Sequence, residues 1–257
     1  MVPVNLRVEP VMGTMVSIEW LDGEQQVVDD VVAWLHTVDR VFSPYRHDSV
    51  VSQLGRNEIT EDQTSPMVTE VLQRCRDLRT LSGGAFDPWA LPAPNGTRFD
   101  PCGFVKGWSI ERAADWMVTR GISDVCINAG GDIAVRGTAE GGQPWRMGIR
   151  HPGDPRALAM VLQAEGPLAV ATSASYERGA HIIHPRHGTP TAEVASATVV
   201  GPSLADADAF ATTLFVMGIG GLYWVDDQPG YGAMVITHDG AVLSTARFDR
   251  HRVPLAA

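Results

Sequence analysis

Hydrophobic residues follow two different spacings along this chain, and the spacings predict its helices and strands. Apolar positions that recur every three or four residues have the period of an amphipathic helix, and they occupy residues 27–40, 66–81, 108–119 and 204–217. Shorter apolar or alternating runs bounded by Gly, Pro, Asn or Asp predict strands. These strands are expected at residues 5–9, 15–20, 125–127, 133–136, 145–149, 159–162, 168–171, 181–183, 198–200, 234–237 and 242–245.

The order of these elements predicts an α+β fold. The strands come in runs separated by a few helices, and a strict alternation of strand and helix is absent from the pattern. Such an order favours a mainly antiparallel sheet with helices packed on one side of it. Because the sequence has no internal repeat, low-complexity segment or clear linker, we expect a single domain over residues 1–257.

Composition and charge exclude several classes of protein. The chain has 257 residues, of which 44% are hydrophobic and 19% charged, so it can bury a sizeable core. Its net charge is -10 and it has no basic run, which argues against non-specific nucleic-acid binding. Its three cysteines are isolated from one another, which fits neither a disulfide framework nor a zinc site.

The start of the chain and its apolar runs bear on its location. Residues 1–10 contain no basic region followed by an apolar core, so they do not resemble a signal peptide. No apolar run in the sequence approaches the length that spans a membrane. We therefore expect a cytoplasmic protein without a membrane segment.

The helix that begins near Leu204 carries the first candidate site. Ser203 can cap this helix, and Asp208 and Thr212 lie four residues apart on one face. A carboxylate and a hydroxyl placed in this way suit Mg²⁺, which prefers oxygen ligands and keeps waters or substrate phosphates. The residues alone leave a second interpretation open, in which the acids only match the dipole at the start of a helix.

Two glycine-containing loops are further candidates. Residues 100–107 include Lys106 and are expected to lead into a helix at Trp108, and a lysine beside a helix N-terminus can hold phosphate. A surface lysine beside a helix start is the alternative. The run Asn128-Ala-Gly-Gly-Asp132 connects two strands and fits either a ligand approach or a tight turn. Neither loop has the Rossmann or P-loop pattern.

A histidine follows a segment rich in hydroxyl groups. Residues 171–178 contain two serines, a threonine and a tyrosine, and His181 comes shortly afterwards at the start of an apolar run. This histidine can serve as a general base near neutral pH, or it can be structural. No serine in the chain stands in a GxSxG elbow.

These motifs as an ordered set resemble one family. The set covers nearly the whole chain and consists of Met12-Gly-Thr14, Phe42-Ser-Pro-Tyr45, Gly83-Gly-Ala-Phe-Asp87, residues 100–107, Asn128-Ala-Gly-Gly-Asp132, residues 145–149 with Pro152, Ala171-Thr-Ser173 with Tyr176-Glu-Arg178, His181-Ile-Ile183 with Pro185-Arg186 and Gly188, and Ala207-Asp-Ala209 with Ala211-Thr212. In this order they resemble the ApbE family, whose members are FAD:protein FMN transferases.

The resemblance implies an activity and its reactants. It implies an α+β fold of the ApbE type, similar to a T-fold, with Mg²⁺ as cofactor and FAD as substrate. The activity would be transfer of FMN from FAD to a Thr or Ser hydroxyl of a target flavoprotein, with release of AMP. Two alternatives stay open, namely hydrolysis of FAD to FMN and AMP, and FAD binding without turnover.

The resemblance also implies roles for single residues. His181 matches the family's proposed base. The positions that match FAD-lining residues are Met12, Tyr45, Ala85, Phe86, Asp87, Asp100, Lys106 and Ile182, and those that match metal ligands are Gly103, Asp208, Ala211 and Thr212. The sequence departs from the family pattern at Pro101, Cys102, Ala174-Ser175 and His184, where the family usually has Leu, a small residue, Gly-Asp and Asp.

Overall fold

A computed structural model describes residues 4–90, 99–174, 182–189, 191 and 193–253. The helices described are α1 (Gln25–Phe42), α2 (Val50–Gly55), η1 (Glu61–Gln63), α3 (Pro66–Leu81), α4 (Cys102–Thr119), η2 (Glu140–Gly142), α6 (Leu204–Met217), η3 (Gly218–Gly220), α7 (Gly221–Asp226) and α8 (Ala246–Asp249). The strands described are β1 (Asn5–Val11), β2 (Thr14–Trp20), β3 (Val125–Ala129), β4 (Asp132–Arg136), β5 (Trp145–His151), β6 (Asp154–Ala164), β7 (Leu168–Ala174), β8 (Val194–Gly201), β9 (Gly232–Thr237), β10 (Val242–Ser244) and β11 (Arg252–Val253).

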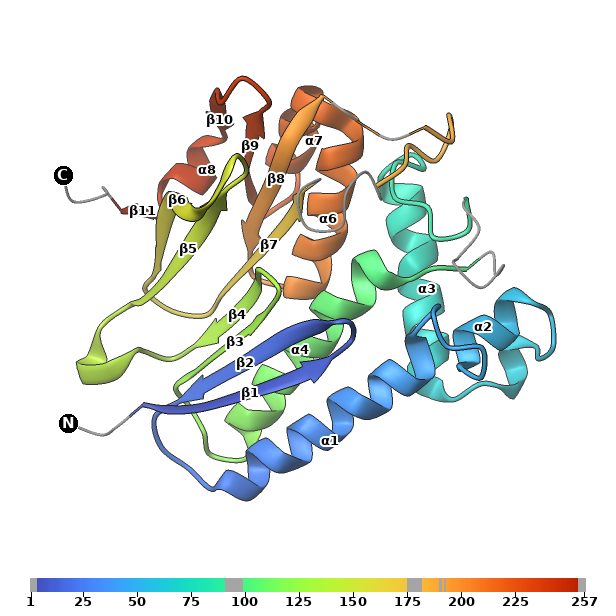
Figure 1. Ribbon diagram of the computed structural model, residues 1–257, viewed down its shortest axis with the longest axis horizontal. Helices are drawn as coiled ribbons and strands as arrows, with labels where there is room; N and C mark the ends of the chain where they lie inside the picture. The colour runs from blue at the N-terminus through green and yellow to red at the C-terminus, as the bar shows by residue number, and fades with distance from the viewer. Residues whose placement is uncertain (1–3, 91–98, 175–181, 190, 192, 254–257) are drawn as a thin grey trace.

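The strands form two antiparallel sheets. The larger sheet has eight strands in the order β1-β2-β3-β4-β7-β8-β9-β10, and the smaller has the order β11-β6-β5. Neighbouring strands pair antiparallel throughout both sheets. The sequence-based prediction of a mixed fold with mainly antiparallel sheet agrees with this arrangement, which Figure 1 shows.

The long helices cover one face of the large sheet, as the sequence pattern predicts (Figure 1). Along β2, Val16, Ile18 and Trp20 are buried, while the residues between them are more exposed. This alternation turns one side of the strand toward the helices, because neighbouring side chains of a strand point to opposite faces. The apolar stripes of α1, α3, α4 and α6 join these residues in one hydrophobic cluster.

The small sheet packs on the opposite face, which the sequence analysis did not predict. Ile133 and Val135 of β4 join a second hydrophobic cluster with residues of β5 and β6, whereas Ala134 joins the helix-side cluster. Strand β4 is therefore buried on both faces. A strand of this kind has no polar alternation, so its sequence does not reveal how many layers cover it.

Helix α4 begins six residues earlier than the sequence pattern predicts. We expected a loop up to Gly107 and a helix from Trp108, but the helix begins at Cys102. The Asp100 carboxylate accepts a hydrogen bond from the Cys102 N–H at 3.0 Å, which satisfies a backbone donor at the helix start. Lys106 consequently lies in the second turn of the helix, so the prediction that it belongs to a loop before the helix was wrong.

Two glycines of α4 allow α6 to approach it closely. A Cβ atom on Gly107 would lie 2.4 Å from the Leu204 carbonyl oxygen and 2.8 Å from the Asp208 Cβ. A Cβ atom on Gly103, one turn earlier, would lie 3.1 Å from the Thr212 hydroxyl oxygen. The crossing therefore places backbone of α4 directly against the face of α6 that carries Asp208 and Thr212.

Helix α6 is the central helix of the fold. Ser203 caps it by accepting the Asp206 N–H at 3.3 Å, and the Ser203 hydroxyl donates to Glu111 at 2.7 Å. By length and composition, one stretch of the described residues, Leu204–Asp226, could cross a membrane, and 61% of its most apolar part is buried inside the protein. This stretch comprises α6, η3 and α7, and its apolar character matches the packing of α6 against α4, β7 and β8.

One expected strand is not found in the described residues. The sequence pattern predicts a strand at residues 181–183, of which His181 lies outside the described residues. Residues 185–187 form a turn, and Ile183 makes only an isolated bridge. The Thr191 N–H donates to the Ile182 carbonyl at 3.2 Å and the His184 N–H to the Thr189 carbonyl at 2.8 Å, so this short apolar run closes on itself locally.

The helix crossing makes a testable prediction about Gly107. Gly107→Ala should lower the free energy of unfolding by about 1–3 kcal/mol, because the added methyl group has no space between α4 and the Leu204 carbonyl. Gly166→Ala is the matched control, since nothing lies within 4 Å of a Cβ atom there. Urea denaturation measures both variants. Equal stability of the two variants would show that the close approach is not a constraint.

Candidate active site

A cavity of about 850 Å³ opens where α4 and α6 meet the turn between β1 and β2. Cavities of this volume accommodate small organic ligands. Its lining comes from segments that are distant in the sequence, namely Met12, Gly13, Val38, Asp39, Phe42, Ser43, Pro44, Tyr45, Ala85, Phe86, Asp87, Pro88, Asp100, Cys102, Gly103, Val105, Lys106, Thr172, Ser173, Ala174, Ile182, Ile183, Pro185, Asp208, Thr212 and Val216.

The cavity brings together most of the residues that the sequence analysis singled out. Those that line it are Met12, Tyr45, Ala85, Phe86, Asp87, Asp100, Gly103, Lys106, Ile182, Asp208 and Thr212. Ala211 is fully buried in α6 and is not part of the lining. His181 lies outside the described residues, so its role as a base stays a prediction.

Asp208 lies in the second turn of α6 and is almost completely buried. Its side chain accepts a hydrogen bond from the Gly107 N–H of α4 at 3.0 Å. Burial first, and then the negative charge of Asp132, raises the pKa of Asp208 to about 7. The first-turn acid of this helix is Asp206, which forms an ion pair with Arg74 at 2.5 Å. The interpretation in which an acid only matches the dipole at the helix start therefore applies to Asp206 and not to Asp208.

Three of the predicted metal-ligand positions converge at the helix crossing. Thr212 follows Asp208 by one turn of α6, and Gly103 of α4 lies against the Thr212 hydroxyl. In a regular helix the Gly107 N–H would donate to the Gly103 carbonyl. Here the Gly107 N–H donates to Asp208, and a backbone carbonyl such as that of Gly103 has two lone pairs, so it can also ligate a cation.

This donor set fits Mg²⁺. The converging groups offer carboxylate, hydroxyl and carbonyl oxygens, and the raised pKa of Asp208 indicates a buried carboxylate that lacks full compensation. No group of three or more His, Cys, Asp or Glu side chains suited to a metal occurs among the described residues. A site with so few protein ligands suits a cation that keeps its waters or binds substrate phosphates, as Mg²⁺ does.

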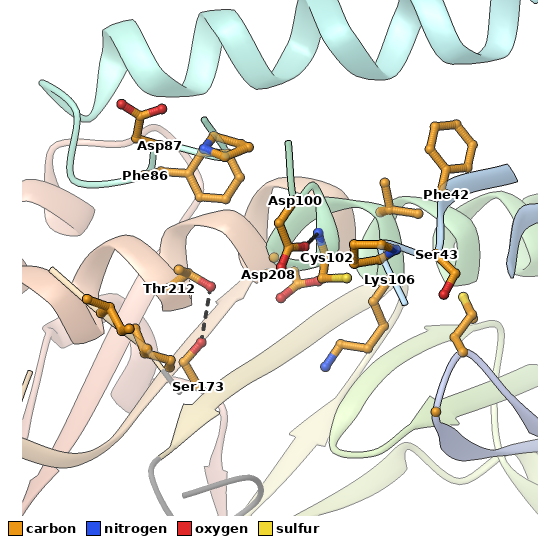
Figure 2. A pocket seen from close by; sticks show the side chains of 18 of the residues that line it. Phe42, Ser43, Phe86, Asp87, Asp100, Cys102, Lys106, Ser173, Asp208 and Thr212 are labelled. Carbon is orange, nitrogen blue, oxygen red and sulfur yellow. Dashed lines mark hydrogen bonds between the residues drawn. The ribbon is translucent and has the colours of Figure 1, made fainter. Parts of the chain in front are cut away.

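Lys106 lies at the floor of the cavity on α4. Its ammonium group is 2.7 Å from the carboxylate of Asp132, which is 0% exposed at the start of β4. In Figure 2 the Lys106 side chain extends away from α4, while the Thr212 and Ser173 hydroxyl groups face each other. These two hydroxyl oxygens lie 3.3 Å apart. The floor of the cavity thus combines one cation with buried acids and hydroxyl groups.

Residues 85–88, which follow α3, form another wall. The Phe86 N–H donates to the Ser82 hydroxyl at 3.0 Å, and Phe86 is buried against Gly103. The Asp87 carboxylate pairs with Arg79 at 2.8 Å and accepts the Trp89 N–H. These contacts fix the backbone of this wall, so it is held in place before a ligand enters.

The opposite rim carries Tyr45 and Met12. Tyr45 is 61% exposed, so its ring can cover a planar ligand at the mouth. Met12 stands in the two-residue turn between β1 and β2 with φ 54°, a conformation that is uncommon outside glycine. The Ser109 hydroxyl contacts the Met12 sulfur at 3.5 Å, which ties this turn to α4.

His184 occupies the position where the resemblance implies an aspartate. Its Nδ1 atom accepts the Arg186 N–H at 3.1 Å, and its ring lies 4.3 Å from that of His187. Partial burial, followed by the charges of His187 and Arg186, lowers the pKa of His184. Its imidazole is therefore neutral near neutral pH, and it supplies no negative charge to the site.

Asp132 and Ser173 belong to the site's surroundings but were not among the sequence-predicted site residues. Both stand in motifs that the sequence analysis singled out, one after a glycine pair and the other in a hydroxyl-rich segment. The motifs alone did not identify which residue of each motif points its side chain toward α4 and α6. Since neighbouring strand residues face opposite sides, a shift of one residue would have reversed the assignment.

Comparisons with known proteins agree on one family. The chain matches the ApbE family over residues 12–99 and 90–235. A relative named FAD:protein FMN transferase from Vibrio cholerae serotype O1 is 26% identical, over 81% of this chain and 80% of its own length. One of the same name from Rhodobacter capsulatus is 27% identical, over 91% of this chain and 56% of its own length.

Solved structures show the same fold. The ApbE protein from Thermotoga maritima has a TM-score of 0.85 and 21% identity, and the match covers 98% of this chain and 100% of that one. The flavin transferase ApbE from Vibrio cholerae has a TM-score of 0.82 and 24% identity, covering 97% and 100%. These matches confirm the α+β fold of the ApbE type, and the family match with the named relatives confirms the sequence-based recognition of the family. With a family match over most of its length, this chain belongs to the ApbE family.

Proposed function

We propose that this protein transfers the FMN part of FAD to a Thr or Ser hydroxyl of a target flavoprotein, in a reaction that requires Mg²⁺ and releases AMP. The observation that carries the proposal is the convergence of Asp208, Thr212 and Gly103 beside Lys106 in one cavity. Relatives across this family are named FAD:protein FMN transferase, which supports the flavin-transfer part of the proposal.

The cavity has one region suited to the flavin of the proposed substrate and another suited to its phosphates. The apolar wall at Phe86 and the exposed ring of Tyr45 suit the flavin, because aromatic side chains pack well against planar rings. Lys106 supplies a positive charge for phosphate oxygens. In the proposed reaction the acceptor oxygen bonds to the FMN phosphorus, the bond from that phosphorus to the AMP oxygen breaks, and AMP leaves.

Asp208, Thr212 and the Gly103 carbonyl would hold Mg²⁺ beside these phosphates. When bound, the cation supplies positive charge that stabilises negative charge on the pyrophosphate. Thr212 is oriented by the Ser173 hydroxyl, and Asp208 by the Gly107 N–H, so both oxygen donors have defined directions. Phosphoryl-type chemistry depends mostly on positioning and charge, so a small set of residues suffices.

His181 is the proposed general base. It would accept the proton of the acceptor hydroxyl as the new oxygen–phosphorus bond forms, a role for which an imidazole is suited near neutral pH. The segment that follows it in the sequence contributes Ile182 and Pro185 to the cavity lining, which supports the proposal.

The reaction itself separates the proposal from its alternatives. Protein mixed with FAD and Mg²⁺ should release AMP only when a candidate acceptor flavoprotein is added, and mass spectrometry should find FMN attached to a Thr or Ser of the acceptor. AMP without an acceptor would identify a hydrolase. Binding of FAD without AMP, across acceptors that relatives modify, would identify a binding protein and refute the proposed transfer.

The cation site predicts a pH-dependent stability. The folded pKa of Asp208, about 7, is raised from the ordinary value of 3.8, so the protonated carboxyl favours folding and this contribution fades as the pH rises toward 7. Asp208→Asn cannot ionise. In the presence of EDTA it should gain about 1–3 kcal/mol over the wild type between about pH 5 and pH 8.

Thermal denaturation with and without Mg²⁺ measures this effect. Adding Mg²⁺ at about pH 8 should raise the melting temperature of the wild type and leave that of Asp208→Asn unchanged, because only the wild type keeps the full charge that binds the cation. If Asp208→Asn and the wild type differ in stability by the same amount at about pH 5 and about pH 8, the assignment of Asp208 as a buried, uncompensated carboxylate is contradicted.

The base is tested by two histidine variants. His181→Ala should lower the transfer rate by roughly 10²–10⁴-fold while FAD binding persists, since a positioned acid–base group typically contributes that much. His184→Asp should not lower the rate, because an aspartate can accept the Arg186 N–H in the same turn and would favour a protonated His181. Near-normal transfer by His181→Ala, or an equal loss in His184→Ala, would refute this assignment.

A further inference from the structure

The Lys106 ammonium interacts electrostatically with two buried carboxylates. One is Asp132, whose Oδ2 atom is 2.7 Å from the Lys106 ammonium. The other is Asp208, whose ionisation is favoured by the positive charge of Lys106 and opposed by the negative charge of Asp132. The structure pairs the ammonium with Asp132, which is not one of the predicted ligands or substrate-binding residues.

The backbone around Asp132 fixes the position of its carboxylate. Gly130 and Gly131 form the turn before it with φ values of 61° and 97°, and a Cβ atom on Gly130 would lie 2.6 Å from the Thr14 hydroxyl oxygen. The Asp132 Oδ1 atom accepts the Thr172 N–H of β7 at 3.2 Å. The carboxylate is therefore anchored to the sheet, and Lys106 reaches toward it from α4.

The charge of Asp132 has little other compensation. Its side chain is 0% exposed and pairs with the Lys106 ammonium at 2.7 Å, while its other charged neighbour, the Asp208 carboxyl, has the same sign of charge when ionised. Asp208 is engaged differently, by the neutral Gly107 N–H. Asp208 also lies against Asp132, whose negative charge opposes its ionisation, so a cation bound at Asp208 would relieve this repulsion.

We propose that Asp132 is a positioning residue that holds the Lys106 ammonium away from Asp208 and thereby keeps Asp208 available to a divalent cation. This inference rests on the proposed function in one respect, because it takes Asp208 to be a ligand of that cation. It adds a residue to which neither the sequence analysis nor the proposed reaction assigns a role.

Loss of the Asp132 charge would redirect Lys106. A buried charge that loses its partner is strongly unfavourable, so the ammonium would turn to the next carboxylate within reach. The four-carbon stem of lysine is flexible enough for such a change. Asp208 is that carboxylate, and an ammonium paired with it would compete directly with the cation.

A simpler role for Asp132 makes a different prediction. If its carboxylate only joins β4 to β7 through the Thr172 N–H, its removal would disturb the site irrespective of Lys106. Removing Lys106 as well would then add a second defect. If Asp132 acts through Lys106, removing the ammonium would cancel the effect of losing the carboxylate. The two roles therefore differ in the double variant.

Binding of Mn²⁺ to the full chain without FAD is the test. Mn²⁺ favours the same oxygen ligands as Mg²⁺, and electron paramagnetic resonance measures its free concentration. Asp132→Asn keeps the size of the side chain and an acceptor for the Thr172 N–H, and at about pH 8 it should weaken Mn²⁺ binding by roughly tenfold or more. The double variant Asp132→Asn with Lys106→Met should bind Mn²⁺ within about threefold of the wild type.

Asp206→Asn is the matched control. This substitution also removes the charge of an ion-paired carboxylate, because Asp206 pairs with Arg74 of α3. Asp206, however, lies outside the cavity lining. The substitution should leave Mn²⁺ affinity unchanged. Circular dichroism of all variants checks that they fold.

Each outcome has one interpretation. Undiminished Mn²⁺ affinity in Asp132→Asn, or a double variant as weak as Asp132→Asn alone, would overturn the positioning role while leaving the proposed function intact. A wild-type protein that binds no Mn²⁺, or binds it as well after Asp208→Ala, would remove the cation site itself and this inference with it. Restored affinity in the double variant is the result expected.

Discussion

The close approach of α4 and α6 is the constraint on which the rest of this structure depends. Gly107 leaves no space for a side chain against the Leu204 carbonyl, and its N–H reaches the Asp208 carboxylate across the contact. The same crossing places Gly103 beside Thr212, one turn earlier along α4 and one turn later along α6. A single packing contact between two helices therefore assembles oxygen donors that come from positions more than a hundred residues apart.

This arrangement concentrates buried charge in a way that favours ligand binding over stability. Asp208 is buried near a second buried acid, Asp132, which is why its pKa is raised to about 7. Lys106 compensates part of this negative charge through Asp132. Functional sites commonly contain ionisable groups with shifted pKa values, because the groups that bind or react need charge states that water would not favour.

Much of the fold could be predicted from the sequence, because strand and helix periodicities are local properties. The limits came from long-range contacts. The start of α4 was placed at Trp108, since Gly103 and Gly107 read as loop residues, whereas in the structure they are helical and required for packing against α6. The second sheet was missed because β4 is apolar on both faces, a pattern that does not show what covers each face.

The site was predictable to a similar extent. The resemblance pointed to Asp208, Thr212 and Lys106, which line one cavity in the structure, but the ion pair between Lys106 and Asp132 requires knowledge of which face of β4 meets α4.

Crystals grown with FAD and Mn²⁺ would test the central claim most directly. Anomalous scattering should place Mn²⁺ between Asp208, Thr212 and the FAD phosphates, with the flavin against Phe86. A cation elsewhere, or FAD bound outside this cavity, would contradict the account.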